Sequence, residues 1–415
     1  TGNQALTINA LNADVNVIDA SGMTTGGSVV QTGRSGTTAA TYTGTAGDDT
    51  FIMGNLADVI AAGEGSDTLD INVTAVLGGI VVDLSATDVV VQANGSLNTT
   101  VQSGFINVDL AGYAGGYGAV VTANKAGSTI TGTAATDQIT GGAGADVINV
   151  ATAGAANNDV MDGGAGANKL VLQAGSNTFA VDSNLVNIQT IELGEAAEVN
   201  LTNQTEGFTI NGGTGANVIE GGAGNDIITG GDGIDTIDLT NGGSDTIKFA
   251  ATGATNDDDA ISGFATGATA DGGDVFDFTA FIATATVQNS LTSSIYNAIT
   301  AAKSLVLDAN LLTAGSLANK IVILKGTVSA YDEAAEIADL FDVSADSNGT
   351  LAGSLAVGGK AIVIVGANDG TELSIAYVHN AATAGIADSE VVIVGSITGA
   401  TADAIDKLIA ANFAL

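Results

Sequence analysis

Residues 221–238 read GGAGNDIITGGDGIDTID, which is two nine-residue units in direct succession. Each unit carries a pair of glycines, a third glycine, an aspartate at position six and an aliphatic residue at position eight. Glycine loses more conformational freedom on folding than any other residue, so its repetition beside an acid indicates a backbone requirement. We expect this stretch to decide the fold.

The nine-residue period extends well beyond these two units. It recurs in three neighbourhoods, at 44–52, 53–61, 62–70, 132–140, 141–149, 154–162, 163–171, 212–220, 221–229, 230–238 and 240–248. Position six is an aspartate or an asparagine in every unit: Asp49, Asp58, Asp67, Asp137, Asp146, Asp159, Asn168, Asn217, Asp226, Asp235 and Asp245. The unit at 53–61 departs from the pattern, because Leu56 stands where a glycine is expected.

Each unit predicts a tight turn followed by a short strand. The first six residues form the turn, in which glycines permit positive φ, and the aliphatic residue at position eight points into a core. Stacked turns bring the aspartates of neighbouring coils together, and such carboxylates require a cation between them. Carboxylate and carbonyl oxygens suit a hard ion with six to eight ligands, so we expect several Ca²⁺ ions.

The composition restricts the partners of the chain. Forty-five acidic residues face nine basic ones, which gives a net charge of −36 and argues against binding to nucleic acid or anionic lipid. The hydrophobic content of 45% argues against disorder. No run of about 18 apolar residues occurs, so we expect no membrane span.

The residues needed for catalysis are scarce. The chain has one histidine, His379, and no cysteine, and it lacks an H-E-x-x-H zinc motif, a G-x-S-x-G nucleophile turn and a phosphate-binding loop. Aromatic residues make up 4% of the chain and tryptophan is absent, which argues against a sugar-cleaving site. We expect that the protein is not an enzyme.

The units resemble the G-G-x-G-x-D-x-U-x repeats of RTX proteins, which bind calcium in a parallel β-helix. The resemblance implies a right-handed parallel β-roll in which each ion lies between one turn and the turn two units later. It places the best sites in the turns 212–217, 221–226, 230–235 and 240–245, with carbonyl ligands from Gly213, Gly215, Gly222, Gly224, Gly231 and Gly233. An ion-free solenoid with acidic turns is the alternative, and it is stronger for 44–70 and 154–171 than for 212–248.

Three segments are expected along the chain. Residues 1–43 and the stretches between repeat blocks, such as GIVVDLS (79–85), DVVVQANG (88–95) and FINVDLAG (105–112), predict solenoid rungs without metal-binding turns. NVIDASG (16–22) and VNIQTIEL (186–193) resemble rungs of calcium-dependent bacterial surface-layer proteins. The repeat-bearing roll spans 44–278 and closes at candidate ligands Asp257, Asp259, Asp274 and Asp277, for which a solvated acidic loop is the alternative.

Residues 279–415 predict a small mixed α/β domain. Helical periodicity appears at 289–303, 331–341 and 400–415, and strands are expected at 320–324, 361–366, 373–378 and 390–396. The end of the chain resembles the uncleaved C-terminal targeting region of type I secretion substrates, and a core-packing helix is the alternative.

The expected fold is therefore mainly β, and the expected function is structural. The resemblance implies a secreted, extracellular protein that assembles with copies of itself into a surface layer or filament and is exported by type I secretion machinery. Two alternatives remain: a calcium-dependent adhesin, and the RTX tail of a larger extracellular enzyme.

Overall fold

The computed structural model describes residues 6–9, 16–23, 29–32, 39–73, 78–113, 116–151, 158–251, 256–282, 299–300, 304–305, 320–324, 337, 360–366, 372–379, 391–398 and 413–414. Two compact units make up the chain, Thr1–Ala197 and Glu198–Leu415.

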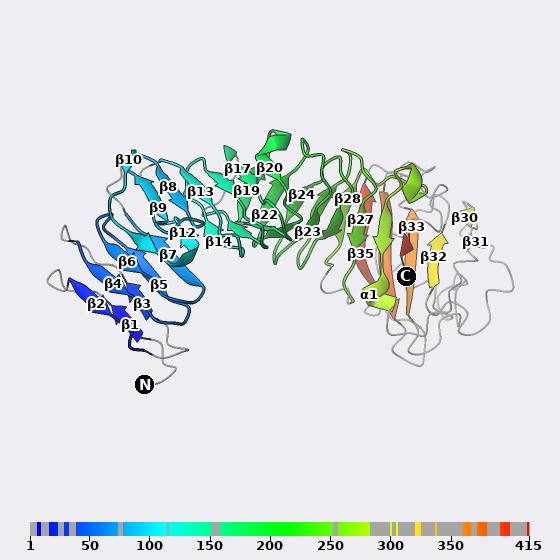
Figure 1. Ribbon diagram of the computed structural model, residues 1–415. Coiled ribbons are helices and arrows are strands. Elements are labelled where there is room, and N and C mark those ends of the chain that lie inside the picture. The colour runs from blue at the N-terminus through cyan, green and yellow to red at the C-terminus, as the bar shows by residue number, and fades with distance from the viewer. Residues whose placement is uncertain are drawn as a thin grey trace. The chain divides into compact units, whose positions relative to one another are not determined.

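The first unit is a parallel β-solenoid in which successive strands alternate between two sides (Figure 1). One side is a single sheet of β1 (Leu6–Asn9), β3 (Val29–Thr32), β5 (Thr50–Met53), β7 (Asp67–Ile71), β12 (Phe105–Asp109), β14 (Thr129–Thr131), β16 (Val147–Asn149), β18 (Lys169–Leu172) and β21 (Thr190–Leu193). The other side begins with β2 (Val17–Asp19), β4 (Thr41–Thr43), β6 (Val59–Ala61) and β11 (Gln102–Ser103). It continues with β8 (Ile80–Asp83), β13 (Ala119–Thr122), β15 (Gln138–Thr140), β17 (Val160–Asp162) and β20 (Leu185–Val186). The strand β19 (Gly175–Thr178) and the short 3₁₀ helix η2 (Asp182–Asn184) lie before β20.

One expected rung of this unit is instead a hairpin. Strand β9 (Val90–Ala93) pairs antiparallel with β8 and with β10 (Ser96–Leu97). Asn94 and Gly95 join β9 to β10 with φ of 52° and 73°. An Asn-Gly pair with two positive φ values is the strongest short hairpin signal, so local turn chemistry replaces the parallel rung predicted at 88–95.

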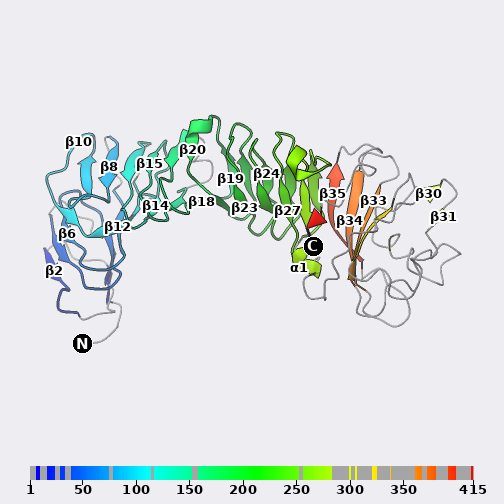
Figure 2. The same ribbon diagram turned by 45° about the vertical axis from the view of Figure 1, so that its right-hand side comes forward.

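The second unit repeats the two-sided coil (Figure 2). One side holds β23 (Thr209–Asn211), β25 (Ile227–Thr229), β27 (Thr246–Lys248), β29 (Val275–Asp277) and β36 (Phe413–Ala414). The other side holds β22 (Ala197–Asn200), β24 (Val218–Glu220), β26 (Thr236–Asp238), β28 (Asp259–Ser262), β35 (Val391–Thr398), β34 (Glu372–His379), β33 (Lys360–Gly366) and β32 (Lys320–Leu324). The short elements η4 (Thr269–Asp271), α1 (Thr279–Ile282), β30 (Ile299–Thr300) and β31 (Ser304–Leu305) complete this unit.

The core of both units follows the nonapeptide pattern. The middle residue of each three-residue repeat strand points inward, as Ile228, Ile237 and Ile247 show with exposed fractions of 0–1%. Full burial of such a side chain stabilises the fold by roughly 1.5–3 kcal/mol. The predicted parallel solenoid with position eight in its core is confirmed.

The last segment of the chain extends the solenoid sheets. Strand β35 pairs in parallel with β28, and β36 pairs in parallel with β29. Aromatic rings pack at this end, where Phe281 stacks on Tyr377 with ring centroids 3.7 Å apart. The Tyr377 hydroxyl donates to the Ala250 carbonyl at 3.0 Å.

The predicted strands of this segment are confirmed, whereas its helices need correction. Within the predicted helix 289–303, Ile299–Thr300 is a strand that pairs antiparallel with β31. Within 400–415, Phe413–Ala414 is a strand, because pairing with the open edge of β29 overrides the helical periodicity. In 331–341 only Ile337 is described, and it is helical and buried. The remaining residues of these three predicted helices lie outside the described residues.

Candidate calcium-binding turns

The predicted position-six ligands all lie buried where a turn meets the following strand. The exposed fraction is at most 3% for Asp49, Asp58, Asp67, Asp137, Asp146, Asp159, Asn168, Asn217, Asp226, Asp235 and Asp245. Asp274 directly before β29 and Asp259 at the start of β28 hold the equivalent place, with exposed fractions of 2% and 4%. Buried carboxylates are costly unless they are hydrogen-bonded or paired with a cation.

A ladder of side-chain hydrogen bonds joins the turns before β23, β25, β27 and β29 of the second unit. We call it the first ladder. Asp226 Oδ1 accepts from the Phe208 N–H at 2.8 Å, and Asp245 Oδ1 accepts from the Asp226 N–H at 2.8 Å. Asp274 Oδ1 continues the series by accepting from the Asp245 N–H at 2.8 Å. Each aspartate therefore fixes the backbone of the turn before it.

The turns before β24, β26 and β28 form the equivalent second ladder on the opposite side of this unit. Asp235 Oδ1 accepts from the Asn217 N–H at 2.7 Å. Asp259 Oδ1 accepts from the Asp235 N–H at 3.0 Å. Consecutive nonapeptides thus contribute to opposite ladders, and every second turn stacks.

The first unit contains the same bonds. Asp67 Oδ1 accepts from the Asp49 N–H at 2.7 Å, and Asp159 Oδ1 accepts from the Asp137 N–H at 2.7 Å. Further bonds of this kind join Ala40 to Asp58, Ala119 to Asp137, Ser128 to Asp146 and Asp146 to Asn168.

The second carboxylate oxygen usually closes its own turn. It accepts from the N–H four residues earlier, at 2.6 Å for Thr45 to Asp49 Oδ2 and at 2.8 Å for Gly142 to Asp146 Oδ2. Asp67 Oδ2 and Asp235 Oδ2 are different, since both are buried without a hydrogen-bond partner. A buried oxygen without a donor is the kind of atom that a metal ion satisfies.

The environment of these carboxyls disfavours their charged form. Burial, with a smaller contribution from the neighbouring aspartate of the stacked turn, raises the pKa of Asp67 and of Asp159 to about 7. Burial raises the pKa of Asp259 to about 8, with additional repulsion from Asp235 and Asp257. Backbone hydrogen bonds oppose these shifts without cancelling them. A bound cation would reverse this balance and keep the carboxylates ionised.

Two carboxylates converge near Gly230. A methyl group built on this glycine would lie 3.1 Å from Asp259 Oδ2 and would clash with Asp235 Oδ2. Asp257, which is exposed and has a φ of 35°, accepts from the Gly233 N–H at 3.2 Å. The structure therefore brings three of the predicted acids to one stacked turn.

The other two candidates from the closing region have different positions. Asp274 belongs to the first ladder, where its Oδ2 also accepts from the Ala265 N–H at 2.6 Å. Asp277 lies at the end of β29, where its carboxylate accepts from the Thr279 N–H at 2.9 Å. Asp277 is thus bonded to the first residue of the short helix α1.

The glycines predicted to supply carbonyl ligands lie in the stacked turns. These are Gly213, Gly215, Gly222, Gly224, Gly231 and Gly233. Gly213 O accepts from the Asp232 N–H at 3.0 Å, so this carbonyl already joins two turns. Gly231 has a φ of 108°, and a Cβ there would clash with Gly213 O. Close stacking of this kind requires glycine and brings carbonyl oxygens beside the carboxylates.

Several amide side chains of the ladders were not predicted. Gln189 Oε1 accepts from the Asn168 N–H at 2.7 Å, in the place that an aspartate holds elsewhere. The Gln102 side chain, which is fully buried, donates to the Asp58 carbonyl at 2.6 Å. Neither residue belongs to a nonapeptide, so the repeat pattern carried no signal for them.

The donor set fits calcium. Within the described ranges, no group of three or more His, Cys, Asp or Glu side chains is arranged to hold a metal ion. An ion in these turns must therefore take most of its ligands from backbone carbonyls, with one or two carboxylates in addition. Such an all-oxygen set, next to buried oxygens without donors, suits Ca²⁺ better than zinc or a soft metal.

Comparison with known families agrees with this geometry. The model of the RTX calcium-binding nonapeptide repeat matches four stretches, residues 36–69, 124–151, 153–181 and 209–237. The comparison with curated proteins gave no match. Among the described residues, none of the helices has the length and hydrophobicity needed to cross a bilayer. The matches coincide with buried aspartate ladders, and the chain is thus a β-solenoid protein that carries RTX calcium-binding nonapeptide repeats.

Proposed function

We propose that this chain is a secreted, calcium-stiffened structural protein that assembles with copies of itself at the cell surface. The observation that carries the proposal is the pair of buried aspartate ladders in a chain with only nine basic residues. Protein cations cannot balance these acids, so divalent ions are needed to stabilise the coil. Proteins with RTX repeats are typically secreted, and calcium is abundant outside cells.

The residues that would hold calcium are those of the stacked turns. Asp226, Asp245 and Asp274 would serve the first ladder, and Asp235 and Asp259 the second ladder. The ion would supply the positive charge that the chain lacks. Because the stacked turns do not exist in the unfolded chain, calcium binding would be coupled to folding.

Assembly is proposed from the charge and from the extent of the solenoid. Two copies with a charge of −36 repel each other at low ionic strength, and divalent ions between exposed acids would offset that repulsion. Solenoid rungs make up most of the described chain. This supports a structural role for the protein. The proposal includes export by type I machinery and the absence of catalysis, the latter supported by the single, exposed His379.

The test compares the purified chain in excess calcium and in excess chelator. We expect light scattering and electron microscopy to show ordered assemblies in calcium, and chelator to abolish both the assemblies and most of the β-sheet circular dichroism. A chain that stays monomeric in calcium would contradict assembly. A chain whose circular dichroism ignores the chelator would contradict calcium-dependent folding as well.

A further inference from the structure

The turn 203–208, with the sequence NQTEGF, stacks on the calcium turn 221–226 although it lacks the glycine pattern. Gln204 O accepts from the Ala223 N–H at 2.9 Å, and Phe208 O accepts from the Ile227 N–H at 2.8 Å. Gly224 packs directly against the main chain of Glu206, where a Cβ on Gly224 would clash. The turn therefore has the backbone placement of a nonapeptide turn.

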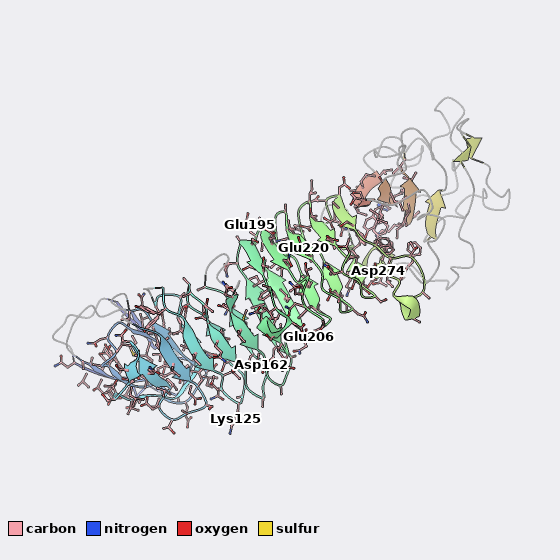
Figure 3. The ribbon with its side chains drawn as sticks, turned by 90° about the horizontal axis from the view of Figure 1, so that it is seen from above. Lys125, Asp162, Glu195, Glu206, Glu220 and Asp274 are labelled. Carbon is pink, nitrogen blue, oxygen red and sulfur yellow. The ribbon has the colours of Figure 1, made fainter. Side chains whose placement is uncertain are left out.

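The side chain at position six of this turn has no oxygen with which to bind an ion. Phe208 takes that place, is 2% exposed, and donates its N–H to Asp226 Oδ1 at 2.8 Å. The acid of this turn is Glu206, two residues earlier, in the loop before β23 (Figure 3). The Gln204 side chain in the same turn is fully buried and brings an amide group.

One oxygen of Glu206 has an unusual environment. Glu206 Oε2 is buried and has no hydrogen-bond partner. In the described part of the chain, the other buried carboxylate oxygens without a partner are Asp67 Oδ2 and Asp235 Oδ2, and both belong to consensus calcium turns. A buried anionic oxygen without a donor is costly unless a cation satisfies it. Glu206 is half-buried as a residue, whereas Asp67 and Asp235 are fully buried, but it shares with them one buried carboxylate oxygen that no donor satisfies.

We infer that the turns 203–208 and 221–226 form an additional Ca²⁺ site in which the Glu206 carboxylate replaces the missing position-six aspartate. This inference rests on the proposed calcium binding of the consensus turns. Glu206 and Asp226 supply the charged ligands, and backbone carbonyls of the two turns supply the rest.

The test counts calcium ions per chain by equilibrium dialysis in Glu206→Gln. Glu195→Gln is the matched control, because Glu195 is exposed and the substitution removes the same charge. We expect Glu206→Gln to bind one ion fewer than the wild type and to show a smaller rise in melting temperature with calcium, while Glu195→Gln matches the wild type. An unchanged ion count in Glu206→Gln overturns the inference. A wild type that binds no calcium overturns the proposed function together with it.

A second measurement does not depend on the variant folding. Crystals of the wild type soaked in Sr²⁺ should show anomalous density within coordination distance of the Glu206 carboxylate. Density beside Asp235 with none beside Glu206 would overturn this site alone and leave the consensus sites intact.

Discussion

Glycine at individual turn positions has two separable roles, conformational freedom and close approach. Gly231 has both, since its φ is 108° and a Cβ would lie 2.9 Å from the Gly212 carbonyl carbon as well as against Gly213 O. Gly242 has the first role alone, because its φ is 92° and no atom lies within 4 Å of a built Cβ. A comparison of Gly231 with Gly242 therefore distinguishes the cost of backbone strain from the cost of a steric clash between stacked turns.

Substitution by alanine should therefore cost more at Gly231 than at Gly242. Gly242→Ala is expected to lower the free energy of unfolding by about 1–2 kcal/mol, which is the usual cost of a left-handed backbone for a residue with a Cβ. Gly231→Ala adds the overpacking of two stacked turns, about 1–3 kcal/mol more. Urea denaturation in excess calcium measures both values, and equal losses at the two positions would show that the turns are not stacked as described.

The sequence predicted which turn residues lie together where a period existed, and their role as ligands stays a prediction. Every position-six residue is buried in a ladder because nine-residue spacing places it at the same point of each turn. Gln189 lies at a ladder position outside the consensus, and Glu206 lies two residues before one, so only the stacked backbone draws attention to them. A side chain that takes over a role from a position outside the nine-residue period cannot be found by searching for that period.

At the scale of whole elements, some turns are joined by neutral groups and others by carboxylates. Asn168 N–H donates to Gln189 Oε1, and Asn168 Nδ2 donates to the Asn187 carbonyl at 2.9 Å. No charge is buried in these bonds, so they do not require a cation. The ladders of the second unit consist of aspartates, apart from Asn217 and Phe208.

Removal of calcium should therefore open strands unequally. In chelator, hydrogen exchange at β25, β26 and β27 is expected to accelerate more than at β18 and β21. We expect a difference of at least about tenfold in the opening equilibrium, which corresponds to roughly 1.4 kcal/mol. Mass spectrometry of exchanged peptides resolves these strands. Equal acceleration in both groups would indicate one cooperative structure rather than locally calcium-dependent turns.

Most strands could be predicted, and the exceptions have physical reasons. Strands with one inward residue follow directly from the nonapeptide, and longer apolar runs such as 361–366 formed the expected strands. The Asn94–Gly95 pair is a hairpin signal in the sequence. The prediction of a parallel rung at 88–95 followed the neighbouring strand pattern instead of this signal. The strand at Phe413–Ala414 depends on the open edge of β29, which no local pattern can reveal.

For the whole molecule, the buried carboxyls determine how stability depends on pH. Asp67, Asp159 and Asp245 have a pKa raised from 3.8 to about 7 in the fold, and Asp259 has one raised to about 8. The folded chain thus holds protons that the unfolded chain has lost between about pH 4 and pH 8. The penalty is absent below the unfolded pKa and complete above the folded pKa.

Without calcium, the free energy of unfolding should therefore decrease as the pH rises from 5 to 8. With saturating calcium the slope over this range should vanish, because the bound ion keeps these carboxyls ionised in the fold, as they already are in the unfolded chain. Urea midpoints at several pH values, measured in chelator and in calcium, test both slopes. A calcium-free stability that increases with pH would mean that these carboxyls are ionised in the fold without a metal.

The alternation of consecutive turns between opposite sides limits how the chain can change in length. Strands β25 and β26 come from adjacent nonapeptides and belong to different sheets, while the stacked partners Phe208 and Asp226 are 18 residues apart. Deleting nine residues would transfer every later turn to the wrong side, whereas deleting eighteen would restore the match. We expect shortened or duplicated versions of this coil to differ by even numbers of nonapeptides. Residues beyond a multiple of eighteen would be accommodated only in the outer loops, as in the 29-residue step from Asp245 to Asp274.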